Sequence, residues 1–335
     1  YGKWQEITMD MVRVGFIGCG GIANWHLQHF EKMDDAKVVA VCDLVEERAN
    51  KASERMDARP YLRYEDMLEK EELDAVYVCV EPSAHNGMEF MIIEKGCHLF
   101  VQKPMTLDMD YAIRVKEELA AKGLLSCVGF QCRYMETWPR LKAWLNMQDV
   151  AFFTGYRIGG MPGVWWWRQK EHSGGQIIEQ TIHNYDLCRL VFGEPVSVEG
   201  MGRSGIVQGV ENYDVDDCSA VTMRFESGVI GTMFTGCFTG FGGENSYQAF
   251  CRDAKAEFGF GSFKVRERNM TIEAKAANDY GQEIDDTFMD AIRTGDGSDI
   301  LSPYEDACKT LKMTLAAQAS IDAGGKLIEL DSWQG

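Results

Sequence analysis

The sequence of 335 residues has no long hydrophobic run, no excess of basic charge and no clustered cysteines. No apolar stretch approaches the roughly 18 residues that a membrane-spanning helix needs, so we expect no membrane partner. Residues 1–6 lack the basic and apolar regions of a signal peptide. Lys and Arg number 34 against 52 Asp and Glu, and the net charge of −18 argues against nucleic acid and anionic membranes as partners.

The eleven cysteines form no C-x-x-C pair and no dense cluster, which argues against a disulfide framework and against a zinc site. Several of them, such as Cys42, Cys79 and Cys127, lie in apolar runs. Scattered free thiols are typical of a reducing cytosol, so we predict a cytoplasmic protein without a bound metal. The sequence also has no internal repeat and no low-complexity segment.

Length and composition predict a globular protein of about two domains. Through about residue 129, apolar strand-like runs alternate with helical patterns, which predicts an α/β fold with a doubly wound parallel (Rossmann) sheet. From about residue 150, short β-like runs follow one another without intervening helices, which predicts an α+β domain with a mainly antiparallel open sheet. We expect the two domains to span residues 10–132 and 133–335.

A glycine-rich turn directly follows the apolar run at 12–17 and opens a helical pattern. The turn matches the G-x-G-x-x-[GA] fingerprint of dinucleotide-binding proteins in the strand–turn–helix context that the fingerprint requires. Its small residues allow a tight turn and close approach of a pyrophosphate, and the helix N-terminus offers free N–H groups to the phosphates. The predicted phosphate-binding residues are Gly18, Gly20, Gly21, Ile22 and Ala23.

The next strand-like run, at 37–42, ends in Asp43, about 20 residues after the fingerprint. A carboxylate at this place accepts hydrogen bonds from a ribose 2′-hydroxyl and repels a 2′-phosphate. Leu44 follows and offers no cation for such a phosphate. The pattern therefore favours NAD over NADP. An alternative role for Asp43 is to cap the helix that begins near Glu46, and the two roles are compatible.

Further candidates follow the ends of later predicted strands. Glu81 and His85 come after one such run, and Gln102 and Lys103 after the next. Ligands of doubly wound sheets bind at the carboxyl ends of the strands, so we predict that all four face the cofactor. Lys103 precedes a proline, which restricts its backbone. Its ammonium is suited to hydrogen-bond the reacting oxygen, and the alternative is an ordinary surface lysine.

The glycine-rich segment at 173–175 leads into a predicted helix over 177–192. On a regular helix Glu179, His183 and Asp186 fall on one arc, and Cβ atoms at i and i+4 lie about 5–6 Å apart. We therefore predict that Glu179 orients the imidazole of His183. Taken alone, the stretch equally fits a buried histidine satisfied by a carboxylate, because such pairs mark function only in some proteins.

Three consecutive tryptophans and an arginine, Trp165 to Arg168, stand shortly before the glycine-rich segment. The three indoles cannot all face one core, so at least one reaches solvent or a cleft, where it is able to stack on sugar C–H groups. The alternative is a loop held in place by large side chains, and we favour that role for at least two of the tryptophans.

Together these motifs resemble the Gfo/Idh/MocA family of oxidoreductases, which includes glucose–fructose oxidoreductase and inositol dehydrogenase. The fingerprint with Asp43 is similar to the nucleotide site of that family. Residues 101–104 resemble its E-K-P motif, 128–134 its V-G-[FY]-x-x-R-[FY] segment, and 174–186 its G-G-x-x-x-D-x-x-x-H-x-x-D stretch. The resemblance covers nearly the whole chain.

The resemblance implies an NAD-dependent oxidoreductase that acts on a CH–OH group of a sugar, polyol or glycoside. It also implies a homodimer or homotetramer formed through the sheet of the second, substrate-binding domain. His183 is then the general acid/base, Lys103 polarises the substrate oxygen, and Glu179 orients the imidazole. The residues predicted to bind substrate are Arg133, Tyr134, Trp165, Trp166, Trp167, Arg168 and Asp186.

Three positions depart from the family pattern. Gln102 replaces the usual Glu, Glu179 replaces the more usual Asp, and Glu81 stands in a segment where Thr-Pro is common. Because Lys103 and His183 are both present, we interpret these as subgroup differences. Two other functions stay open: glycoside cleavage through transient oxidation with no net redox change, and a non-catalytic NAD-binding regulator.

Overall fold

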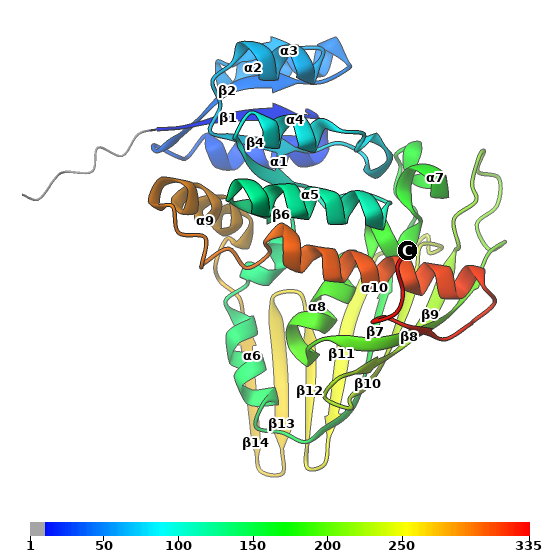
Figure 1. Ribbon diagram of the computed structural model, residues 1–335. Helices are drawn as coiled ribbons and strands as arrows, with labels where there is room; N and C mark the ends of the chain where they lie inside the picture. The colour runs from blue at the N-terminus through cyan, green and yellow to red at the C-terminus, as the bar shows by residue number, and fades with distance from the viewer. Residues whose placement is uncertain (1–10) are drawn as a thin grey trace, which may run out of the picture.

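The computed structural model describes residues 11–335 and contains two sheets joined by helices (Figure 1). The N-terminal residues 1–6 and residue 10, where the first domain was predicted to begin, lie outside the described residues. Figure 1 shows the first sheet with its helices at the top and the second sheet below. No helix among residues 11–335 is both long and apolar enough to cross a membrane.

The first sheet has six parallel strands in the order β3-β2-β1-β4-β5-β6. This order confirms the predicted doubly wound sheet, and it opens a crevice beyond the carboxyl ends of β1 and β4, where the winding reverses. The strands are β1 (Val12–Ile17), β2 (Ala36–Cys42), β3 (Arg59–Tyr61), β4 (Ala75–Val78), β5 (His98–Val101) and β6 (Ser126–Val128).

Helices cover both faces of this sheet, so its strands are apolar on both sides. Along β4, Tyr77 packs with α1 and Val78 packs with α4 and α5 on the opposite face. The helices are α1 (Gly21–Phe30), α2 (Glu46–Met56), α3 (Tyr64–Lys70), α4 (Met88–Glu94) and α5 (Met109–Lys122), with a short turn η1 (Pro82–Ala84) after β4.

The second sheet has nine strands in the order β14-β13-β12-β11-β7-β10-β9-β8-β15. Only the β7–β10 pair is parallel, which confirms a mainly antiparallel sheet. The strands are β7 (Val150–Ile158), β8 (Pro195–Arg203), β9 (Cys218–Phe225), β10 (Ile230–Gly236), β11 (Glu244–Cys251), β12 (Ala254–Gly259), β13 (Ser262–Glu267), β14 (Met270–Lys275) and β15 (Ile328–Glu329).

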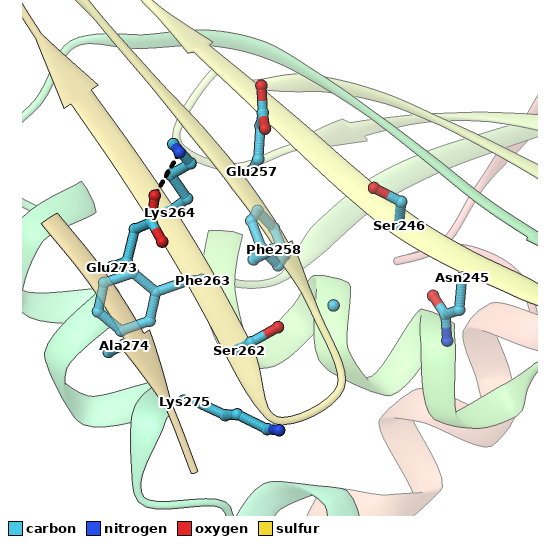
Figure 2. Close-up of a pocket in the computed structure, with 11 residues that line it drawn as sticks. Asn245, Ser246, Glu257, Phe258, Ser262, Phe263, Lys264, Glu273, Ala274 and Lys275 are labelled. Carbon is cyan, nitrogen blue, oxygen red and sulfur yellow. Dashed lines mark hydrogen bonds and ion pairs between the residues drawn. The ribbon is translucent and has the colours of Figure 1, made fainter. Parts of the chain in front are cut away.

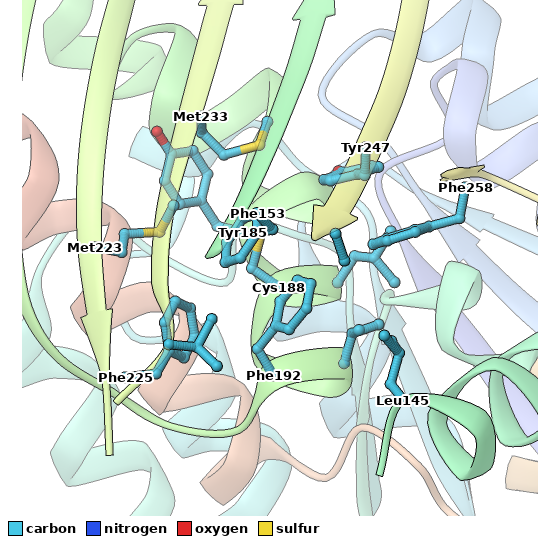
Figure 3. Packing of buried hydrophobic residues seen from close by; sticks show 14 of the residues in the cluster. Leu145, Phe153, Tyr185, Cys188, Phe192, Met223, Phe225, Met233, Tyr247 and Phe258 are labelled. Carbon is cyan, nitrogen blue, oxygen red and sulfur yellow. The ribbon is translucent and has the colours of Figure 1, made fainter. Parts of the chain in front are cut away.

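One face of the second sheet packs on α8 (Ile182–Phe192) through aromatic side chains (Figure 3). The rings of Phe153 and Phe192 stack with centroids 4.1 Å apart, and those of Tyr247 and Phe258 with centroids 5.0 Å apart. Helix α6 (Thr137–Leu145), which the sequence did not predict, joins the same core. This packing fixes the helix that carries His183.

Two late helices connect the sheets. Helix α9 (Tyr280–Thr294) packs Phe288 against the core of the first sheet beside α1, and α10 (Tyr304–Asp322) lies between α5 on one side and α8 and β8 on the other. In Figure 1, α10 runs between the two sheets. These contacts hold the His183 helix in a fixed position relative to the carboxyl ends of the parallel strands.

The predicted continuous helix over 177–192 is wrong. A single π-helical turn, η4 (Gln176–Gln180), precedes α8, and Thr181 separates the two with φ −103° and ψ 7°. The Thr181 N–H donates to the Gln176 carbonyl at 2.9 Å, and its hydroxyl donates to the same oxygen at 3.1 Å. The threonine side chain thus competes for a helix carbonyl and widens the turn, so the regular i,i+4 spacing is lost here.

Candidate active site

The glycine turn after β1 has the space and the donors that a dinucleotide phosphate needs. Gly18 has φ +88°, and a Cβ there would lie 2.5 Å from the Cys79 carbonyl oxygen, so only glycine fits. A Cβ at Gly20 or Gly21 would meet nothing within 4 Å. No side chain caps the N-terminus of α1, which leaves its first N–H groups available to an anion.

Asp43 lies beside this turn at the end of β2. Its Oδ2 accepts from the Cys19 N–H at 2.8 Å, and its Oδ1 accepts from the Val45 N–H at 2.8 Å. Carboxylate oxygens each have a second lone pair, so the half-buried group keeps acceptor capacity for a ribose hydroxyl. Leu44 is exposed and supplies no charge to a 2′-phosphate. The residues therefore fit NAD.

Lys103 follows β5, before a cis peptide bond to Pro104, and forms an ion pair with Glu179. Its Nζ donates to Glu179 Oε1 at 2.6 Å and to the Glu179 backbone oxygen at 2.9 Å. Trp167 Nε1 donates to the other carboxylate oxygen at 2.8 Å. A lysine ammonium has three donors, so one N–H of Lys103 remains for another acceptor.

The prediction that Glu179 orients the imidazole of His183 is wrong, because the carboxylate holds Lys103 and Trp167 instead. The Nδ1 atom of His183 is buried and has no hydrogen-bond partner in the part of the chain that the structure describes. The ring stands edge-on to Phe130, with centroids 5.9 Å apart. Burial, together with the positive charge of Lys103, lowers the pKa of His183 to about 3, so the ring is neutral at pH 7.

The two residues predicted at the end of β4 differ in their surroundings. His85 is buried, and its Nδ1 bonds to Glu89, which also accepts from the Tyr111 hydroxyl at 2.5 Å. Burial raises the pKa of Glu89, but His85 and these hydrogen bonds lower it below its usual value. The Nε2 of His85 is buried without a partner. Glu81 is half-buried and accepts from a nearby serine at 3.4 Å, and cofactor contact by both residues stays a prediction.

Gln102 is buried and belongs to a polar cluster behind the site. Its Nε2 lies 2.6 Å from His26 Nε2, and its Oε1 accepts from the Lys103 N–H at 3.3 Å. His26 and His29 both contact Asp285, at 2.7 and 2.6 Å. Their ligand atoms lie within 4.8 Å of one another, a spacing suited to a metal, but each is already hydrogen-bonded. Gln102 thus contacts the Lys103 turn, and its predicted cofactor contact stays a prediction.

Three residues predicted to bind substrate form a buried structural network instead. Arg133 contacts Asp186 at 2.5 and 2.7 Å and Asp306 at 2.6 Å. Thr310 also donates to Asp186 at 2.8 Å, and the Tyr134 hydroxyl accepts from a backbone N–H at 2.9 Å. The network ties the short turn η2 (Gln131–Tyr134) to α8 and α10. With their polar atoms occupied, these residues are left out of the substrate site proposed below.

The tryptophan segment is divided between solvent and core, which confirms that the three rings do not share one core. Trp165 is 59% exposed and stands edge-on to His172, whereas Trp167, in the turn η3 (Trp166–Arg168), is fully buried. The His172 ring on α7 (Lys170–Ser173) lies 3.0 Å from the Ser83 hydroxyl, which brings this segment onto η1. The bond from Trp167 to Glu179 has no signal in the sequence.

Arg157 on β7 was also missed. It is half-buried, and burial lowers the pKa of its guanidinium, whereas the charges of Cys237 and Glu179 raise it. The alternation along β7 was the available signal, because Phe153 and Arg157 occupy the same face and the ring of Phe153 is stacked on Phe192 of α8. A basic residue that continues the buried face of a strand toward a predicted site is a candidate ligand-binding group.

A groove of about 550 Å³ lies elsewhere, across the ends of β11 to β14 (Figure 2). Lys264 and Glu273 pair with each other at its rim, and Glu257 accepts from Lys255 at 2.9 Å. Asn245 lines the groove and also accepts from Asn184 at 3.2 Å, which is the groove's link to the His183 helix. Its charged pairs are satisfied, and we assign it no chemistry.

Comparisons with known proteins agree with the predicted family and with its NAD-binding fold. Residues 12–130 match the model of an oxidoreductase family with an NAD-binding Rossmann fold, and residues 148–257 match the GFO/IDH/MocA C-terminal domain.

Among curated proteins, the chain is 26% identical to a myo-inositol 2-dehydrogenase of Thermotoga maritima, over 66% of this chain and 67% of that protein. It is 29% identical to a scyllo-inositol 2-dehydrogenase (NAD⁺) of Bacillus subtilis, over 66% of each chain. The chain thus aligns with about two thirds of the length of these relatives.

Among solved structures, an oxidoreductase of Agrobacterium radiobacter in complex with NAD⁺, L-tartaric acid and magnesium has a TM-score of 0.83 at 15% identity. The similarity covers 96% of this chain and 99% of that one, and it shows a common fold.

Proposed function

Because the chain belongs to the GFO/IDH/MocA family of NAD-binding oxidoreductases, we propose that it oxidises a hydroxyl-bearing carbon of a sugar or polyol, or reduces the corresponding carbonyl. The observation that carries this proposal is a lysine with one spare N–H next to a neutral, unpartnered imidazole. Lys103 follows β5 at the carboxyl edge of the dinucleotide-binding sheet, and His183 lies in the first turn of α8. Two relatives named inositol dehydrogenases support a polyol substrate.

In the proposed reaction, NAD held by the glycine turn and Asp43 supplies the hydride acceptor when bound. His183 takes the hydroxyl proton, because its low pKa keeps the ring unprotonated at neutral pH. The free N–H of Lys103 donates to the same substrate oxygen and stabilises the negative charge that develops there. That charge also offsets the repulsion between Lys103 and the protonated ring. Glu179 and Trp167 hold the ammonium in place.

We further propose that copies of the chain associate through the outer face of the second sheet. That face exposes several large apolar side chains, among them Phe152, Ile230, Phe234 and Phe238. A homodimer or homotetramer in the cytoplasm is the assembly we propose, with the first domain at 10–132 and the second at 133–335. Light scattering after gel filtration tests it: Phe234→Glu is expected to lower the measured mass, and an unchanged mass would count against this face.

The activity is tested on purified protein with NAD and a panel of inositols, sugars and glycosides. Absorbance of the reduced nicotinamide and product mass are followed together. We expect NADH to form with at least one polyol or sugar, and His183→Asn to lower kcat by about 10²- to 10⁴-fold while NAD binding is kept. Near-wild-type turnover in that variant would overturn the role of His183.

The same panel separates the two other functions. A glycoside that is cleaved without net NADH formation would indicate transient oxidation, and retained NAD with no turnover of any compound would indicate a regulator. Either result would contradict a simple dehydrogenase.

A further inference from the structure

Arg157 is a half-buried cation whose guanidinium carries a buried nitrogen without a hydrogen-bond partner. Its side chain lies on the same face of β7 as Phe153. This is the face that packs on α8, opposite the outer face of the second sheet. Its Nη1 is buried and makes no hydrogen bond, and within residues 11–335 no carboxylate forms an ion pair with it. Burial lowers the pKa of Arg157, but a guanidinium stays charged at any physiological pH.

The position of Arg157 follows from its neighbours on two sides. On β11 its register partner is Asn245, which accepts a hydrogen bond at 3.2 Å from Asn184, the residue after His183. On the other side its register partner is Thr235 on β10, and Cys237, two residues further along, packs against Trp167, the residue that donates to Glu179. Arg157 therefore lies between the start of the His183 helix and the Trp167–Glu179 contact.

Glu179 does not neutralise Arg157, because its charge is paired with Lys103 and no ion pair joins it to Arg157 within residues 11–335. These three side chains therefore hold two cations against one carboxylate, beside a neutral imidazole. One positive charge is in excess, although the whole chain has a net charge of −18. A buried cation without a counter-ion costs free energy, and an arrangement of this kind is expected where a ligand supplies the missing charge.

We propose that Arg157 binds a carboxylate of the substrate, so that the preferred substrates are sugar acids or polyol acids. A carboxylate carries a single negative charge, which balances the one excess positive charge of these side chains. Its two oxygens also match the planar fork of a guanidinium. A phosphate ester carries more charge than the site offers. This inference rests on the proposed function and names its substrate class.

Matched substrate pairs test the proposal: glucose against glucuronate, and sorbitol against gluconate, each with NAD. We expect kcat/KM to be higher for the acid of each pair. Arg157→Met should raise KM for the acids by about 10- to 100-fold, the loss of a charged hydrogen bond, and should affect the neutral partners much less. Arg157→Lys should fall between, because it keeps the charge and loses the fork. Arg252→Met, at an exposed arginine of the same sheet, is the matched control.

Competition in the wild-type protein gives a readout that does not depend on the folding of a variant. A short carboxylate without hydroxyl groups should inhibit turnover of a neutral polyol, whereas the corresponding amide should not. Equal inhibition by both would overturn the proposal. So would equal losses on neutral and acidic substrates in Arg157→Met, or a preference for sugar phosphates. If neutral polyols react without any preference for acids, only this inference fails, whereas no NADH from either class defeats the proposed function itself.

Discussion

Two ion pairs lie seven residues apart along one segment, a partly buried one at Glu179 and a buried one at Asp186, and they use their hydrogen-bonding groups differently. Asp186 is bound by two nitrogens of Arg133 and by Thr310, and Arg133 is bound again by Asp306. The Lys103–Glu179 pair leaves one lysine N–H free.

Around the Lys103–Glu179 pair, His183 Nδ1 and Arg157 Nη1 are buried without partners. A fully satisfied polar network stabilises a fold, whereas unsatisfied buried groups gathered in one place indicate a site that a ligand completes. We infer that the Arg133–Asp186 pair, whose hydrogen-bonding groups are occupied, stabilises the fold. The Lys103–Glu179 pair, which keeps a free N–H, acts in the proposed reaction. The variants below are chosen to affect one pair and not the other.

Removing Lys103 should have the largest effect. In Lys103→Met the developing charge on the substrate oxygen loses its donor, and we expect kcat to fall by at least about 100-fold with NAD affinity retained. Steady-state kinetics measure the loss. Because Glu179 is then left buried without its cation, the double variant Lys103→Met/Glu179→Gln should recover stability and stay inactive. Lys309→Met is a control at an exposed ion-paired lysine, and activity in the double variant would contradict the role of Lys103.

Breaking the hydrogen-bond network around Asp186 should lower the stability of the fold and leave catalysis unchanged. Asp186→Asn leaves Arg133 buried with one partner fewer, and we expect the free energy of unfolding to fall by about 3 kcal/mol. Denaturant unfolding followed by circular dichroism measures this change. The kcat per folded molecule should stay near the wild-type value, and a large drop in kcat at full stability would show that Asp186 acts in the reaction.

Trp167→Phe should have a smaller effect on the active pair. The indole N–H is lost while most of the buried ring volume is kept, so Glu179 holds Lys103 less firmly. We expect kcat to fall about tenfold, which corresponds to one hydrogen bond of about 1.4 kcal/mol. Trp165→Phe, at the exposed ring, is the matched control and should leave kcat unchanged. An equal loss in both variants would contradict the specific bond to Glu179.

His183 should make a modest contribution to the pH dependence of stability. Its pKa is lowered to about 3 in the folded protein, so below the unfolded-state value near 6.5 the unfolded chain binds more protons. Stability is therefore lost as the pH falls from about 6.5 toward 3. The variant His183→Asn lacks this pH-dependent loss of stability. Thermal melts between pH 7 and pH 4 should therefore show a smaller decrease in Tm for the variant than for the wild type. Parallel curves for both proteins would contradict the lowered pKa of His183 in the folded protein.

Much of the fold was predictable because its signals are local. The run from β1 through the glycine turn into α1 needs only residues close in sequence. Helix α6 was missed, and the break at Thr181 was missed because a threonine side chain, and not the apolar pattern, decides it. Because the turn before Thr181 is π-helical, the predicted pairing of Glu179 with His183, which assumed regular helical spacing, failed.

The sequence by itself determined the dinucleotide turn and the presence of a lysine and a histidine suited to hydride-transfer chemistry, because glycine geometry and side-chain chemistry are properties of single residues and short segments. Only the tertiary structure decided which carboxylate meets which cation. Glu179 pairs with Lys103, 76 residues away, and not with His183 four residues on. Arg157 likewise makes no ion pair within residues 11–335 because Glu179 pairs with Lys103, a result of packing that no spacing in the sequence contains.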